Sequence, residues 1–419
     1  MAGEWEMLQL RDACLKIGSG ATPRGGKEAY KGGATSLIRS QNVYNEGFHR
    51  DGLVYIDDNQ SAELRNVEVK ADDVLLNITG DSVARCCQVA TDILPARVNQ
   101  HVAIIRPKPD SLDARFLRYV LVSHEYQQRL LALASAGATR PALTKTMIEE
   151  LDIPSPPLPT QRAIAHVLGT LDDMIELNRE NNEILEEMAR ALFKSWFVDF
   201  DPVRAKLEGR PPAGMDAATA ALFPEHFHDS ELGQIPKGWE VKTIGDVLEL
   251  AYGKPLKAEH RMGGGVGVYG SNGLVGRHDE RLVTGPGIVV GRKGNPGIVT
   301  WAHGDFYPID TTFFVVPTSE CKSLHFLYYA LTLQDLGNLS ADSAVPGLNR
   351  NHAYMSNQTI PPSSVLECFD AQIAPIFDMM YANSEESRDL ATLRDTLLPK
   401  LLSGEISAPA AEELIAAST

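Results

Sequence analysis

Residues 164–196 read IAHVLGTLDDMIELNRENNEILEEMARALFKSW, and residues 369–401 read FDAQIAPIFDMMYANSEESRDLATLRDTLLPKL. In both stretches a 4-3 spacing repeats, and the two patterns are related by a constant offset of 205 residues. Such a repeat, sustained over more than four heptads, predicts long helices that pair through a coiled-coil seam. The predicted seam comprises Ile164, Leu168, Leu171, Ile175, Asn178, Asn182, Leu185, Ala189, Leu192 and Trp196 in the first helix, and Phe369, Ile373, Ile376, Met380, Asn383, Ser387, Leu390, Arg394, Leu397 and Leu401 in the second.

Polar residues interrupt both predicted seams midway along the helices: Asn178 and Asn182 in the first, Asn383 and Ser387 in the second. An antiparallel pair centred on its midpoints would place Asn178 opposite Ser387 and Asn182 opposite Asn383. A parallel, in-register pair would also match polar to polar. In either arrangement buried polar residues fix the register at some cost in stability. The alternative is that these positions are half exposed.

The segments that precede the two helices resemble each other. Both end at prolines, which terminate a domain and prepare a helix start. Matching landmarks are Trp5-Glu6 and Trp239-Glu240, strand-like residues 99–105 and 310–316, Phe116-Leu117 and Phe326-Leu327, and the prolines in 153–157 and 360–362. The sequence therefore predicts an α+β protein in which two globular mixed α/β domains are joined by two long helices with an internal pseudo-twofold repeat. The expected boundaries are 1–158 and 236–363 for the domains, 159–197 and 364–405 for the helices, 198–235 for a linker loop and 406–419 for a tail.

The composition is that of a protein able to bury several cores, with 43% apolar residues in 419. The net charge of −16 is unusual for a DNA-binding protein, but residues 1–158 carry only −2 and residues 236–363 carry 0. The acidity therefore belongs to the helices and linkers. Five scattered cysteines, no apolar run of membrane-spanning length and no signal-peptide pattern predict a cytoplasmic protein with free thiols.

Catalytic motifs are not evident. Residues 265–270 match G-x-G-x-x-G, but turn residues flank them where a dinucleotide site needs a strand and a helix. Residues 20–27 miss the P-loop spacing, and Glu28 stands where a magnesium-binding hydroxyl is needed. No amino-methyltransferase, nuclease or nucleophile-elbow motif occurs. These observations favour a recognition protein over an enzyme.

Four stretches carry a resemblance to a known family: PLPTQRAI at 157–164, LFKSWFVDFDP at 192–202, LGQIPKGW at 232–239 and LRDTLLPKLLSGE at 393–405. In this order they resemble the specificity subunit of type I restriction–modification systems, across essentially the whole chain. The start of the second helix departs from the family pattern, with VLECFD at 365–370 where Pro-x-x-x-Gln is usual.

The resemblance implies two target recognition domains, residues 1–158 and 236–363, that each read one half of a split DNA site. It implies that the two helices pair antiparallel and hold the domains apart. The implied partners are double-stranded DNA, two modification (methyltransferase) subunits and motor–nuclease restriction subunits, with no membrane. Chemistry would reside in those partners, which would bind S-adenosylmethionine, ATP and Mg²⁺, whereas this chain would hold no cofactor or metal and catalyse nothing.

Residues able to contact DNA are Lys or Arg for phosphates, and Arg, Lys, Asn, Gln or Ser on exposed loops for bases. Glycine-rich settings suggest that some of these loops approach a ligand closely. Each could instead be an ordinary solvated loop residue. The candidates are Arg24, Lys27, Arg39, Gln41, Asn42, Tyr44, Arg140 and Lys145 in the first domain, and Lys254, Lys257, Tyr269, Ser271, Asn272, Arg292, Lys293, Asn295, Asn349 and Arg350 in the second.

Two other functions remain open at this point. The chain could be a coiled-coil scaffold of prophage or anti-restriction type whose heads bind protein. It could also be a nucleotide-dependent enzyme with a cryptic site. A scaffold predicts no DNA sequence preference, whereas an enzyme predicts turnover by the isolated chain.

Overall fold

The computed structural model describes residues 5–23, 25, 30, 32–136, 141–261, 263–334, 336–339 and 347–418. It divides into two compact units. Unit 1 comprises Met1–Glu176 and Ser387–Thr419, and unit 2 comprises Leu177–Glu386. Each long helix therefore contributes one part to each unit.

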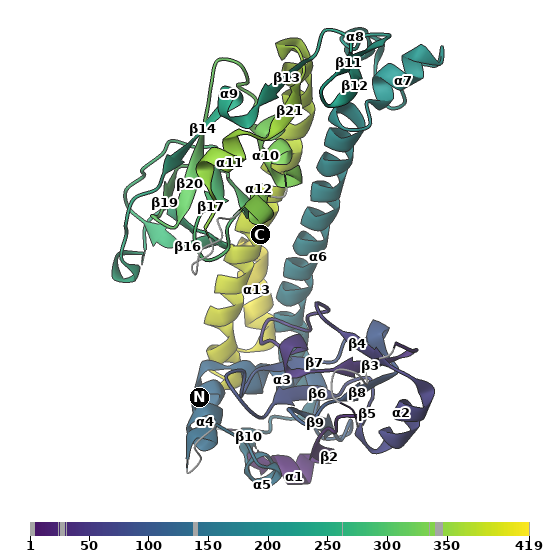
Figure 1. The fold of residues 1–419 in the computed structure, drawn as a ribbon. Coiled ribbons are helices and arrows are strands. Elements are labelled where there is room, and N and C mark those ends of the chain that lie inside the picture. Colours follow the sequence, from purple (N-terminus) through teal and green to yellow (C-terminus); the bar gives the residue numbers. More distant parts are fainter. Residues whose placement is uncertain are drawn as a thin grey trace. The chain divides into compact units, whose positions relative to one another are not determined.

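Unit 1 contains three small sheets (Figure 1). The central sheet is antiparallel, with the order β2-β9-β6-β7, and its apolar side chains face two cores. The second sheet has the order β4-β3-β8-β5 with β3 and β8 parallel, and β1 pairs with β10. The strands are β1 (Met7–Gln9), β2 (Cys14–Ser19), β3 (Thr35–Ile38), β4 (Val54–Ile56), β5 (Glu68–Val69), β6 (Val74–Asn77), β7 (Cys86–Gln88), β8 (Ala96–Val98), β9 (Val102–Pro107) and β10 (Asp152–Pro154).

Unit 2 repeats this plan. Its central sheet has the order β14-β20-β17-β18, a second sheet has the order β16-β15-β19 with β15 and β19 parallel, and β13 pairs with β21. The repeat predicted from Trp5 and Trp239 is thus a repeat of strand order. The strands are β11 (Phe227–Ser230), β12 (Gly233–Pro236), β13 (Glu240–Thr243), β14 (Leu248–Tyr252), β15 (Val266–Gly270), β16 (Gly273–His278), β17 (Gly287–Gly291), β18 (Val299–Ala302), β19 (Phe306–Pro308), β20 (Thr312–Pro317) and β21 (Asn357–Ile360).

Short helices connect the strands, and two 40-residue helices follow the two sheet regions. The α-helices are α1 (Leu10–Ala13), α2 (Asp58–Glu63), α3 (Ala114–Val122), α4 (His124–Ser135), α5 (Lys145–Glu149), α6 (Leu158–Phe197), α7 (Asp201–Leu207), α8 (Ala217–Ala221), α9 (Ile244–Val247), α10 (Leu324–Leu333), α11 (Arg350–Tyr354), α12 (Ser363–Leu402) and α13 (Ala408–Ser418). The 3₁₀ turns are η2 (Ser40–Asn42), η3 (Arg65–Val67), η4 (Thr91–Ile93), η5 (Ala258–His260) and η6 (Leu336–Leu339).

The α6 and α12 helices pair antiparallel within each unit. In unit 2, Trp196 near the end of α6 contacts Phe369 near the start of α12, with ring centroids 5.9 Å apart. Farther along, the Asn383 amide donates to Asn182 Oδ1 at 2.9 Å, which is the pairing expected for antiparallel helices. Asn178 donates to Glu386 at 2.8 Å. All predicted seam residues are buried or half-buried.

The linker differs from the plain loop that its prolines and glycines predict. Residues 198–235 form α7, α8 and strands of the β11-β12 hairpin, and Phe200, Phe223 and Ile235 are buried in the core of unit 2. The tail likewise contains α13, whose Ala411 packs into the core of unit 1. Apolar anchors spaced through these segments, rather than turn residues, determine their structure. No described helix is long and apolar enough to span a membrane.

Candidate nucleic-acid interface

One end of the central sheet of unit 2 gathers several predicted DNA-contacting residues. There β14 ends at Tyr252, β17 ends before Arg292 and β20 begins at Thr312. The Tyr252 ring is half exposed, and the Arg292 and Arg350 guanidinium carbons lie 4.8 and 5.1 Å from its centroid. Cation–π contacts of this kind orient guanidinium groups while leaving N–H donors for a ligand. We call this end of the sheet the strand-end surface.

Further polar residues extend the strand-end surface of unit 2. Lys293 is exposed and its backbone forms a bridge to Gly347. Asn295 donates to the side chain of Asn272, so the turns after β15 and β17 meet, and Ser271 lies beside them against Gly291 and Gly294. Lys254 is exposed and follows β14 at the same end. The structure therefore brings most of the candidates in this unit together.

Three other candidates in unit 2 contact neighbouring residues of their own chain. Tyr269 is half-buried, its ring packs against Phe306 at 6.1 Å, and burial raises the pKa of its hydroxyl. Asn349 caps α11 by accepting from the backbone N–H of Asn351 and His352. Lys257 pairs with Glu259 at 3.5 Å on the surface.

Unit 1 has an equivalent strand-end surface where β2 and β6 end and β9 begins. Its backbone bridge joins Thr79 to Ala142, as Lys293 joins Gly347 in unit 2. Lys145 is the first residue of α5, as Arg350 is of α11, and both short helices follow a capping residue. Lys145 is exposed and lies 3.4 Å from Glu149. The two surfaces thus have the same backbone plan and different side chains.

Four candidates in unit 1 follow β3. Asn42 is fully buried and its amide bonds the backbone of Arg39, His49 and Asp51, so it shapes the turn and has no access to DNA. Arg39 donates to the Gly52 carbonyl, whereas Gln41 is exposed. The Tyr44 ring is stacked on His49, with centroids 4.1 Å apart.

Arg85, which is not among the sequence candidates, places its guanidinium 4.5 Å from the Tyr44 ring. No local motif marks this residue, because it comes from the β6–β7 connection and meets Tyr44 only through the fold. Arg24, Lys27 and Arg140 lie outside the described residues.

Two glycines at the strand-end surfaces lie close to the backbone of the same chain. A Cβ at Gly20 would collide with the Val98 carbonyl, and one at Gly253 would collide with that of Ile309. At these two glycines the chain's own backbone already accounts for the need for glycine.

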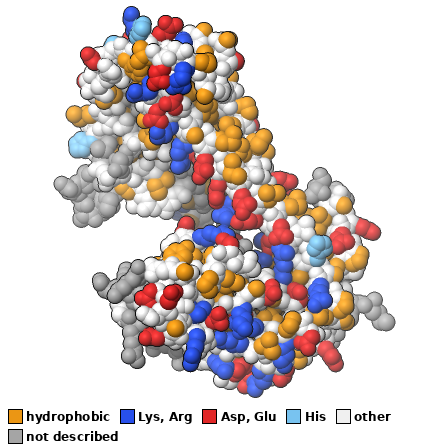
Figure 2. Space-filling view, turned by 90° about the vertical axis from the view of Figure 1, so that its right-hand side faces the viewer, with side chains coloured by type: hydrophobic (Ala, Val, Ile, Leu, Met, Phe, Trp, Pro, Cys, Tyr) orange, Lys and Arg blue, Asp and Glu red, His pale blue; other side chains and the backbone are white. Residues whose placement is uncertain are grey.

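Charges of both signs are mixed on the face of unit 1 shown in Figure 2. This matches the near-neutral charge of residues 1–158. Affinity for a polyanion would then depend on a few placed cations rather than on a broad basic field. Among the described residues, no group of three His, Cys, Asp or Glu side chains could hold a metal ion.

A buried ionic cluster attaches the sheet region of unit 1 to both long helices. Asp172 of α6 accepts from Tyr119 of α3 at 2.7 Å and from Arg394 of α12 at 2.7 Å, and it pairs with Arg118. Burial alone would raise the pKa of Asp172, but Arg118 and its other partners hold that pKa below the ordinary value. One indication of this cluster is present in the sequence, because Arg394 is a charged residue at an apolar position of the predicted seam.

At the corresponding positions of unit 2 lies an aromatic cluster. Offsets of 210 and 205 residues relate Arg118, Tyr119 and Asp172 to Tyr328, Tyr329 and Phe377. Phe377 is buried, with its centroid 5.7 Å from that of Tyr328 and 6.1 Å from that of Tyr329.

Comparisons with known proteins agree with this architecture. A family model described as "Type I restriction modification DNA specificity domain" matches residues 2–187 and 236–389. The chain is 27% identical to the HindI specificity subunit of Haemophilus influenzae, over 81% of the chain and 87% of that protein. It is 26% identical to the MjaIX specificity subunit of Methanocaldococcus jannaschii, over 96% and 94%. The fold resembles a crystal structure of a type I S subunit from M. genitalium, with a TM-score of 0.56, 18% identity and coverage of 95% and 96%.

Proposed function

Since the chain belongs to the family of type I restriction–modification DNA specificity proteins, we propose that it is the subunit that selects the DNA sequence for such a complex. Residues 1–158 and 236–363 act as two target recognition domains, and each reads one half of a split site. The observation that carries the proposal is the duplicated strand-end surface. The same backbone plan, with different side chains, suits two domains that read different half-sites by the same mode.

The proposed contacts are a subset of the sequence candidates. In residues 236–363 they are Arg292, Arg350, Lys293 and Lys254 with the Asn272–Asn295 pair. In residues 1–158 they are Lys145, Gln41 and Arg39, together with Arg24, Lys27 and Arg140. Arg292 and Arg350 are the strongest candidates for base contacts, because a guanidinium oriented against a ring can present two parallel donors to guanine.

Partner subunits supply the chemistry in this proposal. Two modification subunits bind S-adenosylmethionine and methylate adenine, and motor–nuclease subunits use ATP and Mg²⁺ in the cytoplasm. The chain itself neither methylates nor cuts DNA. Methylation by the rigorously purified chain would contradict this part of the proposal.

Mapping of methylated adenines tests the reading surfaces. The chain, co-produced with its modification subunits, should direct methylation to one split site. Arg292→Ala should weaken binding by about 1–3 kcal/mol and relax one half of that site. Lys145→Ala should act through residues 1–158 and leave the half read by residues 236–363 unchanged.

The matched control is Arg210→Ala, which removes an exposed arginine from the linker. It should leave the methylated sequence unchanged. A protein-binding scaffold predicts no site in any variant. If Arg292→Ala folds, assembles and methylates the native site with native preference, the strand-end surface is not the reading surface.

A further inference from the structure

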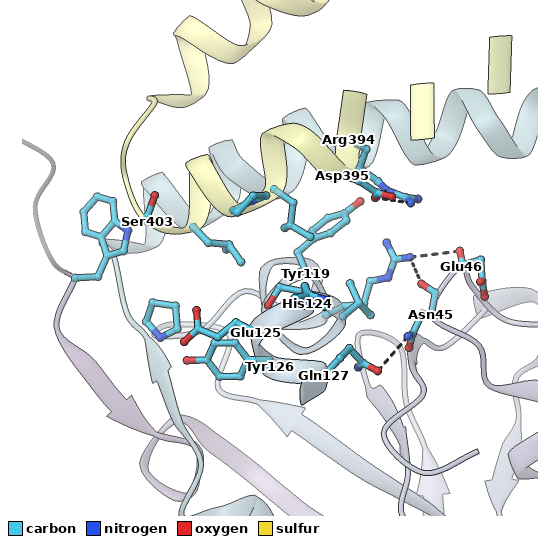
Figure 3. A pocket seen from close by; sticks show the side chains of 18 of the residues that line it. Asn45, Glu46, Tyr119, His124, Glu125, Tyr126, Gln127, Arg394, Asp395 and Ser403 are labelled. Atoms are coloured by element: carbon cyan, nitrogen blue, oxygen red, sulfur yellow. Dashed lines mark hydrogen bonds and ion pairs between the residues drawn. The ribbon is translucent and has the colours of Figure 1, made fainter. Parts of the chain in front are cut away.

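Unit 1 contains a pocket of about 910 Å³ between the α3–α4 region and the last turns of α12. Figure 3 shows Tyr119 and Arg394 on one side and Glu125 and Tyr126 on another. Trp5, Leu398 and Leu402 add apolar surface. Its volume is in the range of sites that bury a ligand or an anchoring side chain.

The corresponding space in unit 2 is filled by the chain itself. Trp239, the counterpart of Trp5, is buried, and its ring lies 5.9 Å from Phe197, the counterpart of Leu402. Phe200 and Phe223 of the linker close the site, with centroids 5.7 and 6.3 Å from that of Trp239. The occupant in unit 2 is therefore the linker, which inserts aromatic rings that flank its short helices α7 and α8.

That occupant also carries basic side chains next to its rings. Lys206 of α7 donates to the carbonyl of Phe223 at 2.6 Å, and the Arg204 guanidinium lies over the Phe227 ring. In unit 1 only α13 follows α12 among the described residues, and it contributes no residue to the pocket lining. The repeat thus leaves one filled site and one open site.

The charge of the open pocket matches such a segment. Glu46, Glu125 and Asp395 line it. The two arginines in the lining, Arg118 and Arg394, both pair with Asp172. Arg394 also pairs with Asp395 at 2.8 Å, so the net negative charge of the lining rests on Glu46 and Glu125. Acidic side chains beside apolar ones in one pocket favour a basic segment with an aromatic anchor.

We propose that this pocket receives a segment of a modification subunit that carries an aromatic side chain beside Lys or Arg. The inference rests on the proposed assembly with such subunits. Because the equivalent site in unit 2 is filled, the described part of each chain offers one such pocket. Only one modification subunit per chain is held in this way.

A photo-crosslinking amino acid at Met7, an exposed residue of the lining, tests the proposal in the reconstituted complex. The expected product joins this chain to one segment of a modification subunit with an aromatic residue and a Lys or Arg within one helical turn. The yield should saturate at one subunit per chain. The same probe at exposed Met355 of unit 2, outside the pocket, should not give that product.

A substitution provides an independent measurement. Leu402→Glu should raise the dissociation constant of the modification subunit at least tenfold, whereas Met355→Glu should change it less than twofold. Crosslinks only within the chain, crosslinks to a partner segment without an aromatic and a basic residue, or none in an assembled complex would overturn the proposal. If the native chain forms no complex at all, the proposed function fails first.

Discussion

The two units attach their sheet regions to the long helices through equivalent positions with opposite chemistry. In unit 1 the ionic cluster of Arg118, Tyr119, Asp172 and Arg394 makes directional bonds. In unit 2 the aromatic cluster of Tyr328, Tyr329 and Phe377 makes ring contacts. The backbone plan is the same in both units. The position of a sheet region on its long helices can therefore be fixed by either chemistry.

The ionic cluster and the aromatic cluster contribute to stability in different ways. A buried ion pair is costly to desolvate, and it stabilises little relative to well-packed apolar residues, but it is very sensitive to loss of one partner. Aromatic packing contributes through buried area and tolerates small shifts. We therefore expect the stability of unit 1 to require all the hydrogen bonds and ion pairs of its ionic cluster, and the stability of unit 2 to depend on the side-chain volume of its aromatic cluster.

Removing the shared carboxylate should have the largest effect. Asp172→Ala leaves Arg118, whose side chain is only 8% exposed, and Arg394 without their common partner. The expected destabilisation of unit 1 is about 3–5 kcal/mol. Hydrogen exchange measured by mass spectrometry should show faster exchange in residues 5–136 and no change in residues 236–334. An equal loss of protection in both regions would contradict a local role of Asp172.

Removing the Phe377 ring of the aromatic cluster should destabilise the protein somewhat less than Asp172→Ala does. Phe377→Ala is expected to destabilise unit 2 by about 3 kcal/mol, through lost packing and the cavity that remains. This loss should be the same in 0.1 and 1 M salt. Urea unfolding at both salt concentrations makes the measurement. A strongly salt-dependent loss would show that packing is not its cause.

Replacing the ionic cluster of unit 1 by the residues of unit 2 tests whether the two clusters are equivalent. The triple variant Arg118→Tyr, Asp172→Phe and Arg394→Ala transplants the residues found at the equivalent positions of unit 2. Buried ionic groups replaced together by apolar residues are often neutral or stabilising, so unit 1 should stay within about 1 kcal/mol of the native chain. The single Asp172→Phe variant is the control and should be much less stable. Additive losses in a triple-mutant cycle would refute equivalence of the two clusters.

The smallest effect concerns pH. The pKa of Asp172 is lowered, so its stabilisation is present above the ordinary aspartate pKa of about 3.9 and is lost as pH falls through the lower folded value. Burial raises the pKa of Glu186, which accepts from Tyr329. Its contribution has the opposite sign, being present below about pH 4.3 and lost as pH rises through the raised folded value.

Acidification from pH 7 to about 4.5 should therefore slightly raise the hydrogen-exchange protection factors of unit 2, which are corrected for the intrinsic pH dependence of exchange, and leave those of unit 1 unchanged. Glu186→Gln should abolish the gain. If the protection of unit 2 fell over this pH range in the native chain, the assigned direction of the Glu186 pKa shift would be wrong.

The long helices were predictable from the 4-3 repeat with its polar layer, whereas their antiparallel direction was implied only by the family resemblance, because both directions match polar to polar. The duplicated strand order followed from landmarks such as Trp5 and Trp239. The linker was not predictable as structured, since its apolar anchors Phe200 and Phe223 are far apart among turn residues. The site was predicted only in part. Loop residues such as Arg292 were proposed by type and stay predictions, whereas the contact of Arg85 with Tyr44 and the burial of Asn42 depend on distant segments.

Unit 1 is assembled from both the early and the late parts of the sequence, whereas unit 2 is one continuous stretch. On the ribosome, residues up to Glu176 emerge before Leu177–Glu386, and the α12 residues that cover Leu168 and Leu171 emerge only afterwards. At about 5–20 residues per second, that delay is roughly 10–40 s. During it, the first domain exposes an apolar helix face that chaperones can bind, while the second domain can already complete its own core.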